Sequence, residues 1–238
     1  DYGYDEVPYR QRRRRRRKKR KRSLLRRRLM KWGLLFCLGA VLYLGYTFYT
    51  QWSKPYTVAL DAGHGGEDSG AEGLVQEAVL TEDTVEALEQ LLRTDGRFRI
   101  VLTRKKGETM SINDRKAKLQ RAHADLILSI HGNAEETGDG YGFECYPSPP
   151  GRENYEISLR FGQNLAEAME QAGARLRGDE GIRYGYYIGE EKWLTEETTV
   201  YDYPTFGILE DMDCPAVLAE QCFITNAQDV EDFASPQG

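Results

Sequence analysis

The sequence has little cysteine, and it has almost no acidic residues near its start. Four cysteines among 238 residues are too few for a scaffold built on disulfides. Residues 1–31 hold three of the 38 acidic residues and 16 of the 33 basic ones, a net charge of +13, whereas the remaining 207 residues carry −18. Because an acidic domain repels a polyphosphate, a uniformly basic nucleic-acid-binding protein is excluded, and no nucleic-acid partner is expected. An apolar content of 40% with 15 tyrosines excludes wholesale disorder.

A long uncharged segment follows the basic start. Residues 12–22 are an uninterrupted run of Arg and Lys, and residues 32–49 contain no formally charged side chain. At about 1.5 Å per residue the uncharged segment spans roughly 27 Å as a helix, close to the hydrocarbon core of a bilayer at about 30 Å. Trp32 and Trp52 stand at its two ends, where aromatic side chains meet the lipid headgroups. The sequence therefore predicts a single membrane-spanning helix whose basic N-terminus stays in the cytoplasm.

This anchor divides the chain into four parts. We expect a disordered basic cytoplasmic tail, a transmembrane anchor in the cytoplasmic membrane, a linker and an extracytoplasmic domain, at residues 1–31, 32–50, 51–56 and 57–238. The basic tail is also expected to lie on anionic lipid. A cleaved signal peptide would need a site of small residues after the apolar segment. A lipoprotein anchor at Cys37 would need a small residue where Phe36 stands. A nuclear-import or RNA-binding tail does not explain the adjoining apolar helix.

After the anchor, short apolar runs alternate with helical patterns. The candidate strands are residues 57–61, 99–104, 125–131, 142–146 and 216–220. Apolar residues recur with helical spacing between the strands, and Ser111 with Asp114 three residues later predicts the start of a helix. Near-continuous apolar strands separated by helices predict an α/β fold with a mostly parallel central sheet flanked by helices. Residues 177–203 are expected to form a long loop or a hairpin beside the functional site.

Polar residues stand where three of these strands end. His64 and His131 follow two buried runs, Glu220 ends the last, and Glu77 opens the first helix on the same side. Since the carboxyl ends of parallel strands share one edge, these side chains are expected to converge. Two His and one Glu with a water molecule form an open catalytic zinc site. Each residue also has an ordinary explanation: a structural hydrogen bond for either histidine, a helix N-terminus for Glu77 and an arginine partner for Glu220. His123 is expected inside a helix, in a structural role.

Four blocks of sequence carry a family resemblance. They are VALDAGHGGEDSGAEG (residues 58–73), Glu77, LILSIHGNA (126–134) and PAVLAEQCFITN (215–226). In this order they resemble the signature blocks of zinc-dependent N-acetylmuramoyl-L-alanine amidases, across essentially the whole outer domain. The resemblance implies a sheet of about six strands, one Zn²⁺ per chain bound by His64, Glu77 and His131, and Glu220 as the catalytic carboxylate. The glycines after His64 would let the backbone approach the substrate.

The resemblance also implies a reaction. Peptidoglycan would be the substrate, cut at the amide between the lactyl group of muramic acid and the L-alanine of the stem peptide. Zinc lowers the pKa of its bound water to about 7, and Glu220 would accept the proton and pass it to the departing amine. Two rival functions stay open, a zinc peptidase of the stem peptide and an inactive wall-binding or regulatory domain. Asn133 would bind substrate or shape a turn, and Arg115 is equally explained by a structural ion pair.

The chain departs from the family pattern at two positions near these blocks. Ala62 stands where the family often has Pro, which a loop tolerates. Cys222 stands where the family usually has Gly, and it adds a side chain close to Glu220. That side chain could clash with substrate, form a disulfide with Cys145 or Cys214, or have no effect.

Overall fold

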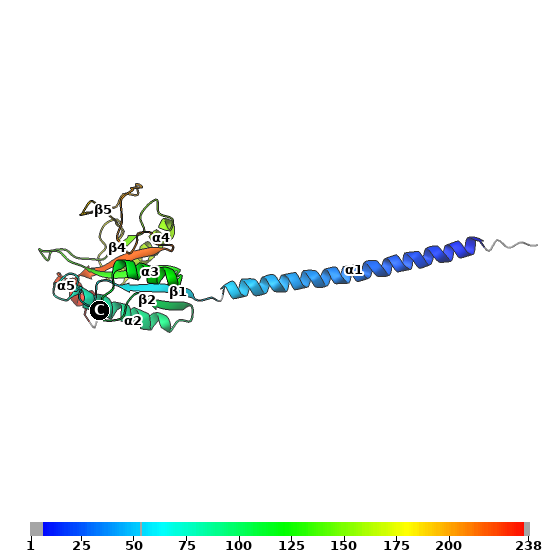
Figure 1. Cartoon of the computed structure of the whole chain (residues 1–238), viewed down its shortest axis with the longest axis horizontal. Helices are drawn as coiled ribbons and strands as arrows, with labels where there is room; N and C mark the ends of the chain where they lie inside the picture. Colours follow the sequence, from blue (N-terminus) through cyan, green and yellow to red (C-terminus); the bar gives the residue numbers. More distant parts are fainter. Residues whose placement is uncertain (1–6, 53, 236–238) are drawn as a thin grey trace, which may run out of the picture. The chain divides into compact units, whose positions relative to one another are not determined.

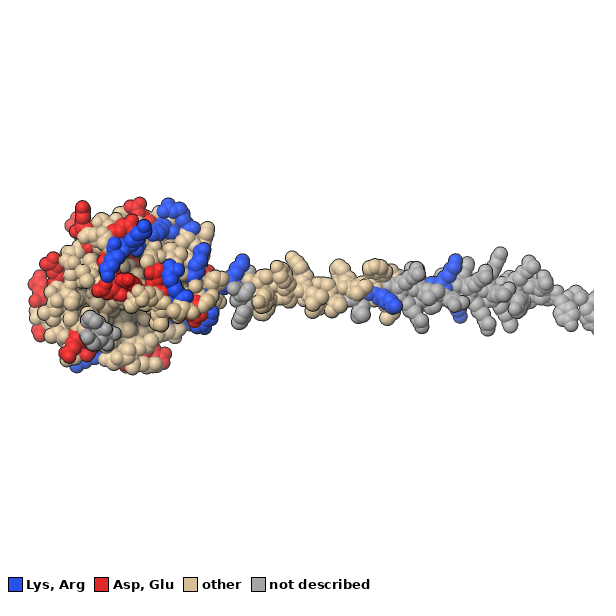
Figure 2. Space-filling model, turned by 90° about the horizontal axis from the view of Figure 1, so that it is seen from below, with Lys and Arg blue, Asp and Glu red and all other residues tan. Residues whose placement is uncertain are grey.

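The computed structural model describes residues 7–52 and 54–235, and the chain divides into two units after Lys54. The first unit is a single helix, α1 (Val7–Trp52). Within it, Leu29–Thr50 is long and apolar enough to cross a membrane, judged by length and composition. The only charged residue of this stretch is Lys31, and the space-filling view shows uncharged side chains along most of it, whereas acidic and basic side chains are interspersed on the visible face of the outer domain (Figure 2).

The basic segment continues the same helix, where the sequence predicts disorder. Arg and Lys are good helix formers, and a helix already nucleated in the apolar segment extends at little further cost. Secondary structure therefore marks no boundary at residue 32, and the division between tail and anchor remains a prediction from charge. Residues 1–6 of the expected tail lie outside the described residues.

The outer domain is built on one twisted sheet (Figure 1). Its strands are β1 (Tyr56–Ala62), β2 (Phe98–Leu102), β3 (Leu126–Asn133), β4 (Glu144–Pro147) and β7 (Ala216–Phe223), in the order β2-β1-β3-β7-β4. All neighbours run parallel except β4, which pairs antiparallel with β7. The predicted α/β fold with a mostly parallel sheet is confirmed, with five strands in the sheet where about six were expected.

The remaining two strands form a hairpin of their own. They are β5 (Tyr184–Ile188) and β6 (Glu191–Thr195), which pair antiparallel with each other. The hairpin predicted within residues 177–203 is thus present. Among the described residues, one isolated bridge, between Cys145 and Ile182, joins the segment before the hairpin to β4, so the hairpin does not extend the central sheet.

Helices and a loop cover the two faces of the sheet. They are α2 (Glu77–Arg93), α3 (Ile112–Ala122), α4 (Tyr155–Gln171) and α5 (Ala227–Phe233). One core contains Leu60 and Val217 of the sheet with α2 and α4, and the other contains Ile127 and Leu218 with α3 and residues 206–209. The backbone N–H of Asp114 donates to the Ser111 hydroxyl at 3.2 Å, which confirms the predicted helix start.

His123 lies outside the helix in which it was expected. It is the residue that ends α3, with a left-handed φ of 49°. A polar residue in this conformation stops the helix and turns the chain toward β3. The structural role expected of it fits this position, but the helical placement was wrong.

The topology brings three strand ends and one strand beginning to the same edge. β1, β3 and β7 are parallel and finish there, whereas β4 runs the other way and starts there. Ligand sites in such sheets lie beyond the carboxyl ends of the strands. This edge therefore places the side chains discussed next.

Candidate metal centre

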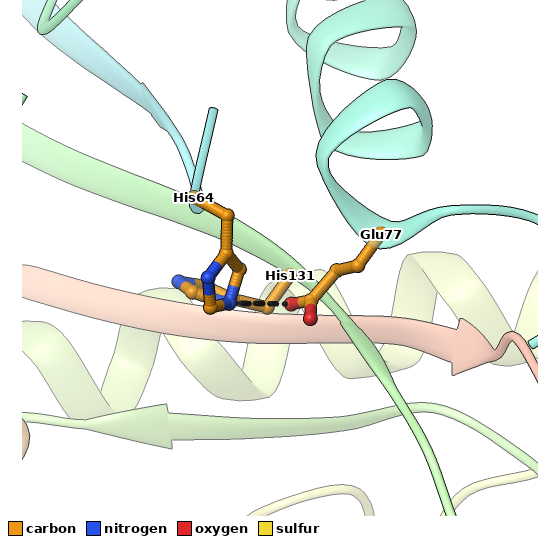
Figure 3. A group of neighbouring side chains, drawn as sticks. All are labelled: His64, Glu77 and His131. Carbon is orange, nitrogen blue, oxygen red and sulfur yellow. Dashed lines mark hydrogen bonds and ion pairs between the residues drawn. The ribbon is translucent and has the colours of Figure 1, made fainter. Parts of the chain in front are cut away.

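His64, Glu77 and His131 meet at this edge of the sheet (Figure 3). His64 follows β1, Glu77 is the first residue of α2 and His131 lies in β3. One ligand atom from each residue lies within 4.8 Å of the other two. The structure therefore brings together the three side chains that the sequence analysis placed on a common edge.

One carboxylate oxygen joins the two imidazoles. Oε1 of Glu77 lies 3.2 Å from Nε2 of His64 and 2.9 Å from Nδ1 of His131. The hydrogen bond to Glu77 raises the pKa of His64 to about 9. Burial alone would raise the pKa of Glu77, but hydrogen bonds from both histidines hold it well below its usual range. Two imidazoles thus face one anionic oxygen in a compact cluster.

This donor set fits a zinc ion. Imidazole nitrogen and carboxylate oxygen are both ligands that Zn²⁺ accepts, and three protein ligands leave a fourth position for water or substrate. The other oxygen of Glu77 accepts a hydrogen bond from the backbone N–H of Ala71 at 2.8 Å, which orients the carboxylate. Nδ1 of His64 lies 2.9 Å from Oδ2 of Asp68, so Nε2 is the nitrogen turned toward the cluster. A second partner of this kind is typical of metal-binding histidines.

Two buried arginines hold the backbone that carries His64. Arg104 donates to the carbonyls of Ala62 and Gly63, both at 3.0 Å. Arg115 donates to the carbonyls of Ala62 and His64, and it forms an ion pair with Asp61 at 2.8 Å. His64 itself has a left-handed φ of 58°, a conformation that side-chain-bearing residues keep only under constraint. The ion-pair explanation of Arg115 is confirmed, and the arginines fix the turn on which His64 stands.

The glycines of the first block allow the protein to pack closely around the cluster. A Cβ added to Gly63 would lie 2.5 Å from the ring of His131, and one added to Gly70 would lie 2.6 Å from Oε2 of Glu77. No side chain larger than hydrogen fits at these two positions.

The glycines after His64 were predicted to let the substrate backbone approach, but the contacts show another use. Gly65 lies against Arg104, and Gly66 lies against Thr109.

Glu220 lies beside His131. The two residues are direct neighbours in the parallel register of β7 and β3, so their side chains project from the same face. Glu220 is 9% exposed, and its Oε2 has no hydrogen-bond partner among the described residues. Burial raises the pKa of Glu220 to about 7; the charge of His131 opposes this rise, and that of Glu77 adds to it. A buried carboxyl with a free oxygen and a pKa near neutrality can take up and release a proton at neutral pH.

Glu144 is a further buried carboxylate that the sequence analysis did not identify. It pairs directly with Glu220 across the antiparallel β4–β7 register and is 1% exposed. The amide of Asn133 donates to its Oε1 at 2.6 Å, so Asn133 is engaged within the protein. The signal available in the sequence was a single charged residue inside the apolar run of the fourth candidate strand.

Cys222 does not reach the site. It is fully buried in a small cluster with Leu80 and Ile224, and burial raises the pKa of its thiol to about 12. Cys145, Cys214 and Cys222 are all free thiols. A disulfide at Cys222 is therefore excluded. The Cys222 side chain, which stands where the family usually has Gly, is accommodated by packing against its neighbours.

The sequence of the outer domain matches a known family. The family model described as N-acetylmuramoyl-L-alanine amidase (Amidase_3) matches residues 58–238, well over half of the chain. The chain belongs to this amidase family. Membership assigns the outer domain to the amidases, a class of hydrolases.

Curated relatives share this region at modest identity. The probable N-acetylmuramoyl-L-alanine amidase AmiB of Haemophilus influenzae is 27% identical over 213 residues, which are 79% of this chain and 49% of the relative. LytC of Bacillus subtilis, also named an N-acetylmuramoyl-L-alanine amidase, is 30% identical over 73% of this chain and 30% of its own length. The chain thus spans about half or less of these two relatives.

Solved structures agree with the fold. An N-acetylmuramoyl-L-alanine amidase from Clostridium difficile 630 aligns with a TM-score of 0.62 and 25% identity, covering 78% of this chain and 89% of that one. The catalytic domain of CwlV from Bacillus (Paenibacillus) polymyxa aligns with a TM-score of 0.59 at 23% identity, over 76% and 88% of the two chains. The likeness to CwlV concerns the fold alone.

Proposed function

We propose that the outer domain, residues 57–238, is a zinc-dependent peptidoglycan amidase. The observation that carries the proposal is the approach of His64, Glu77 and His131, whose ligand atoms lie within 4.8 Å of one another at the edge of an amidase-family sheet. A zinc ion bound there would polarise the substrate carbonyl and make water nucleophilic near neutral pH. The three side chains would hold one ion and leave one position open.

Glu220 would act as the general base and acid. Its unpartnered Oε2 and its place beside His131 allow it to accept the proton of the attacking water and to pass that proton to the departing amine. A positioned proton acceptor of this kind is typically worth about 10²–10⁴-fold in rate.

The bond that we propose is cut is the amide between the lactyl group of muramic acid and the L-alanine of the peptidoglycan stem. The relatives and the solved structure named as N-acetylmuramoyl-L-alanine amidases support this choice. A zinc peptidase of the stem peptide would leave the sugar–peptide linkage intact and shorten the stem, so mass spectrometry of the products separates the two activities.

Residues 32–50 would anchor the domain in the cytoplasmic membrane as a single span. The hydroxyls of Thr47 and Thr50 donate to the carbonyls of Leu44 and Thr47, at 2.9 and 3.0 Å, so neither needs water inside a bilayer. The basic residues before the span would stay on the cytoplasmic side and lie on anionic lipid, which leaves the outer domain in the cell envelope.

The decisive experiment uses the full chain in detergent. We expect stoichiometric zinc by metal analysis and release of L-alanine amino termini from muropeptides. Glu220→Gln should retain zinc and lose activity by at least about 10²-fold. Glu136→Gln, at an exposed carboxylate, is the matched control and should behave as wild type. A protein without stoichiometric zinc, or an active Glu220→Gln variant, would contradict the proposal; a zinc-free protein would favour the inactive wall-binding or regulatory domain.

A further inference from the structure

Two arginines converge on the buried carboxylate beside Glu220. Nε of Arg177 and Nη1 of Arg183 lie 3.3 and 3.2 Å from Oε2 of Glu144. The two arginines come from the segment between α4 and β5, which runs along the free side of β4. The backbone N–H of Arg177 donates to the carbonyl of Phe143, and that of Arg183 donates to the carbonyl of Cys145.

This pair of arginines borders the proposed reaction centre. Glu144 is the direct register partner of Glu220, which is in turn the register partner of His131. The side chains of Glu144, Glu220 and His131 thus lie on neighbouring strands, on one face of the sheet. Because neighbouring strands are about 4.8 Å apart, Glu144 lies roughly 10 Å from His131, and the two guanidinium groups lie beside Glu144. Two residues of an extended substrate cover about 7 Å of that distance, and the contacts at its two ends cover the rest.

The two guanidinium groups are only partly used by the protein. Both arginines pair with the buried Glu144, and Nε of Arg183 also forms an ion pair at 3.0 Å with Glu196, whose side chain is 47% exposed. The side chains of Arg177 and Arg183 are 33% and 20% exposed, so solvent and ligands reach them. Among the described residues no hydrogen bond is made by Nη2 of either arginine. Each guanidinium has five N–H donors in a planar fork that matches a carboxylate.

Glu144 fixes the orientation of the two arginine side chains. Its Oε1 is occupied by Asn133, and its Oε2 takes one donor from each arginine. Arg177 also donates to the carbonyl of Tyr141 at 3.3 Å and lies 4.7 Å from the ring centre of Phe223. The N–H groups bound within the protein fix the orientation of both guanidinium groups. This reduces the entropy that is lost when a ligand binds to the remaining N–H groups.

We propose that Arg177 and Arg183 form a subsite that binds a carboxylate on the peptide side of the substrate. This inference rests on the proposed function and deepens it. In the linkage to be cut, the sugar side offers hydroxyls and amides, whereas the stem peptide offers free carboxylates. The unused N–H donors of the two arginines match the carboxylates of the peptide side.

The test compares two forms of one muropeptide that the wild-type full chain cleaves. They differ only at the second stem residue, which carries a free carboxylate in one and a carboxamide in the other. We expect the wild type to prefer the carboxylate by about tenfold or more in kcat/KM, the effect of one lost charge-assisted hydrogen-bond pair. Arg177→Gln and Arg183→Gln should each bring this ratio close to one. Arg177→Lys keeps the positive charge but lacks the paired N–H donors of the guanidinium, so it should give an intermediate ratio.

Arg175→Gln is the matched control. Arg175 is an exposed arginine two residues from Arg177, and its guanidinium lies 4.7 Å from the Tyr141 ring without contacting Glu144. It should keep the wild-type ratio. A wild-type ratio near one, or a ratio that persists in Arg177→Gln, would overturn the subsite. Should Arg183→Gln fail to fold, as a thermal melt would show, the more exposed Arg177 decides the question. Failure of the wild type to cut either form at the lactyl–alanine bond would instead overturn the proposed function.

Discussion

Oδ2 of Asp68 lies 2.9 Å from Nδ1 of His64, on the side of the imidazole that faces away from Glu77. The contact fixes which ring nitrogen is presented to the metal-ligand cluster. Asp68 also accepts a hydrogen bond from the backbone N–H of Gly70 at 3.1 Å, so its own position is constrained. We therefore predict that Asp68→Asn weakens zinc binding by about 10–100-fold, the usual cost of losing such a partner.

Chelator competition on the full chain measures this effect. Glu67→Gln is the control, because Glu67 is the adjacent exposed carboxylate and its side chain is not part of the cluster. Equal zinc affinities for Asp68→Asn and Glu67→Gln would show that Asp68 does not orient His64.

A second prediction concerns stability and pH. Burial by itself raises the pKa of Asp61, but the charge of Arg115 and hydrogen bonds from Ser129 and Thr103 bring it below its ordinary value. The stabilisation is therefore present above the pKa of the unfolded state, about 4, and is lost as pH falls through the lower pKa of the folded state. Asp61→Asn leaves Arg115 buried without a partner and should cost about 3–5 kcal/mol near neutrality.

Urea unfolding at several pH values tests this. The difference between wild type and Asp61→Asn should be constant above about pH 5 and should shrink at lower pH. Asp139→Asn, at an exposed carboxylate, should show no such difference at any pH. A difference that stays constant down to pH 2 would contradict the assigned charge state.

A third prediction uses the close approach at Gly63. A methyl group at this position would lie 2.5 Å from His131, so Gly63→Ala must displace the ring or the turn. We expect the loss of most zinc binding, together with about 1–3 kcal/mol of stability. Gly96→Ala is the matched control, because nothing lies within 4 Å of a Cβ there. Zinc titration and thermal unfolding of both variants would show whether the effect belongs to the site.

A fourth prediction concerns the thiols. Burial raises the pKa of both Cys145 and Cys222 to about 12, and the thiolate is the form that reacts. Iodoacetamide at pH 8 should therefore leave both unlabelled in the native protein and label both after unfolding without reductant. Persistent protection after unfolding would indicate a disulfide and would contradict the free thiols found here.

The three metal-binding candidates were predictable because parallel strands have a common direction. Once His64 and His131 were placed at the ends of apolar runs, and Glu77 at the start of the following helix, their convergence followed from topology. Asp68 and Glu144 were not predicted. Their roles depend on a left-handed turn at His64 and on the pairing of β4, neither of which is encoded in a local pattern.

The direction of β4 and the length of α1 could not be predicted from the local sequence. The run containing Glu144 was recognised as a strand, but its apolar pattern does not distinguish a parallel from an antiparallel neighbour. A block of like charges predicts disorder for residues 7–31, whereas the helix propensity of Arg and Lys favours the helix that the structure has there.

The reversed direction of β4 has a consequence for how this scaffold tolerates length changes. Because β4 starts at the edge where β1, β3 and β7 finish, the connection ahead of it, residues 134–143, borders the reaction centre. The connection behind it, residues 148–154, emerges at the distal edge. Insertions in the first should shift Glu144 and the arginines attached to it, whereas insertions in the second, whose residues 148–150 are buried, should disturb the packing of the distal edge and leave Glu144 in place.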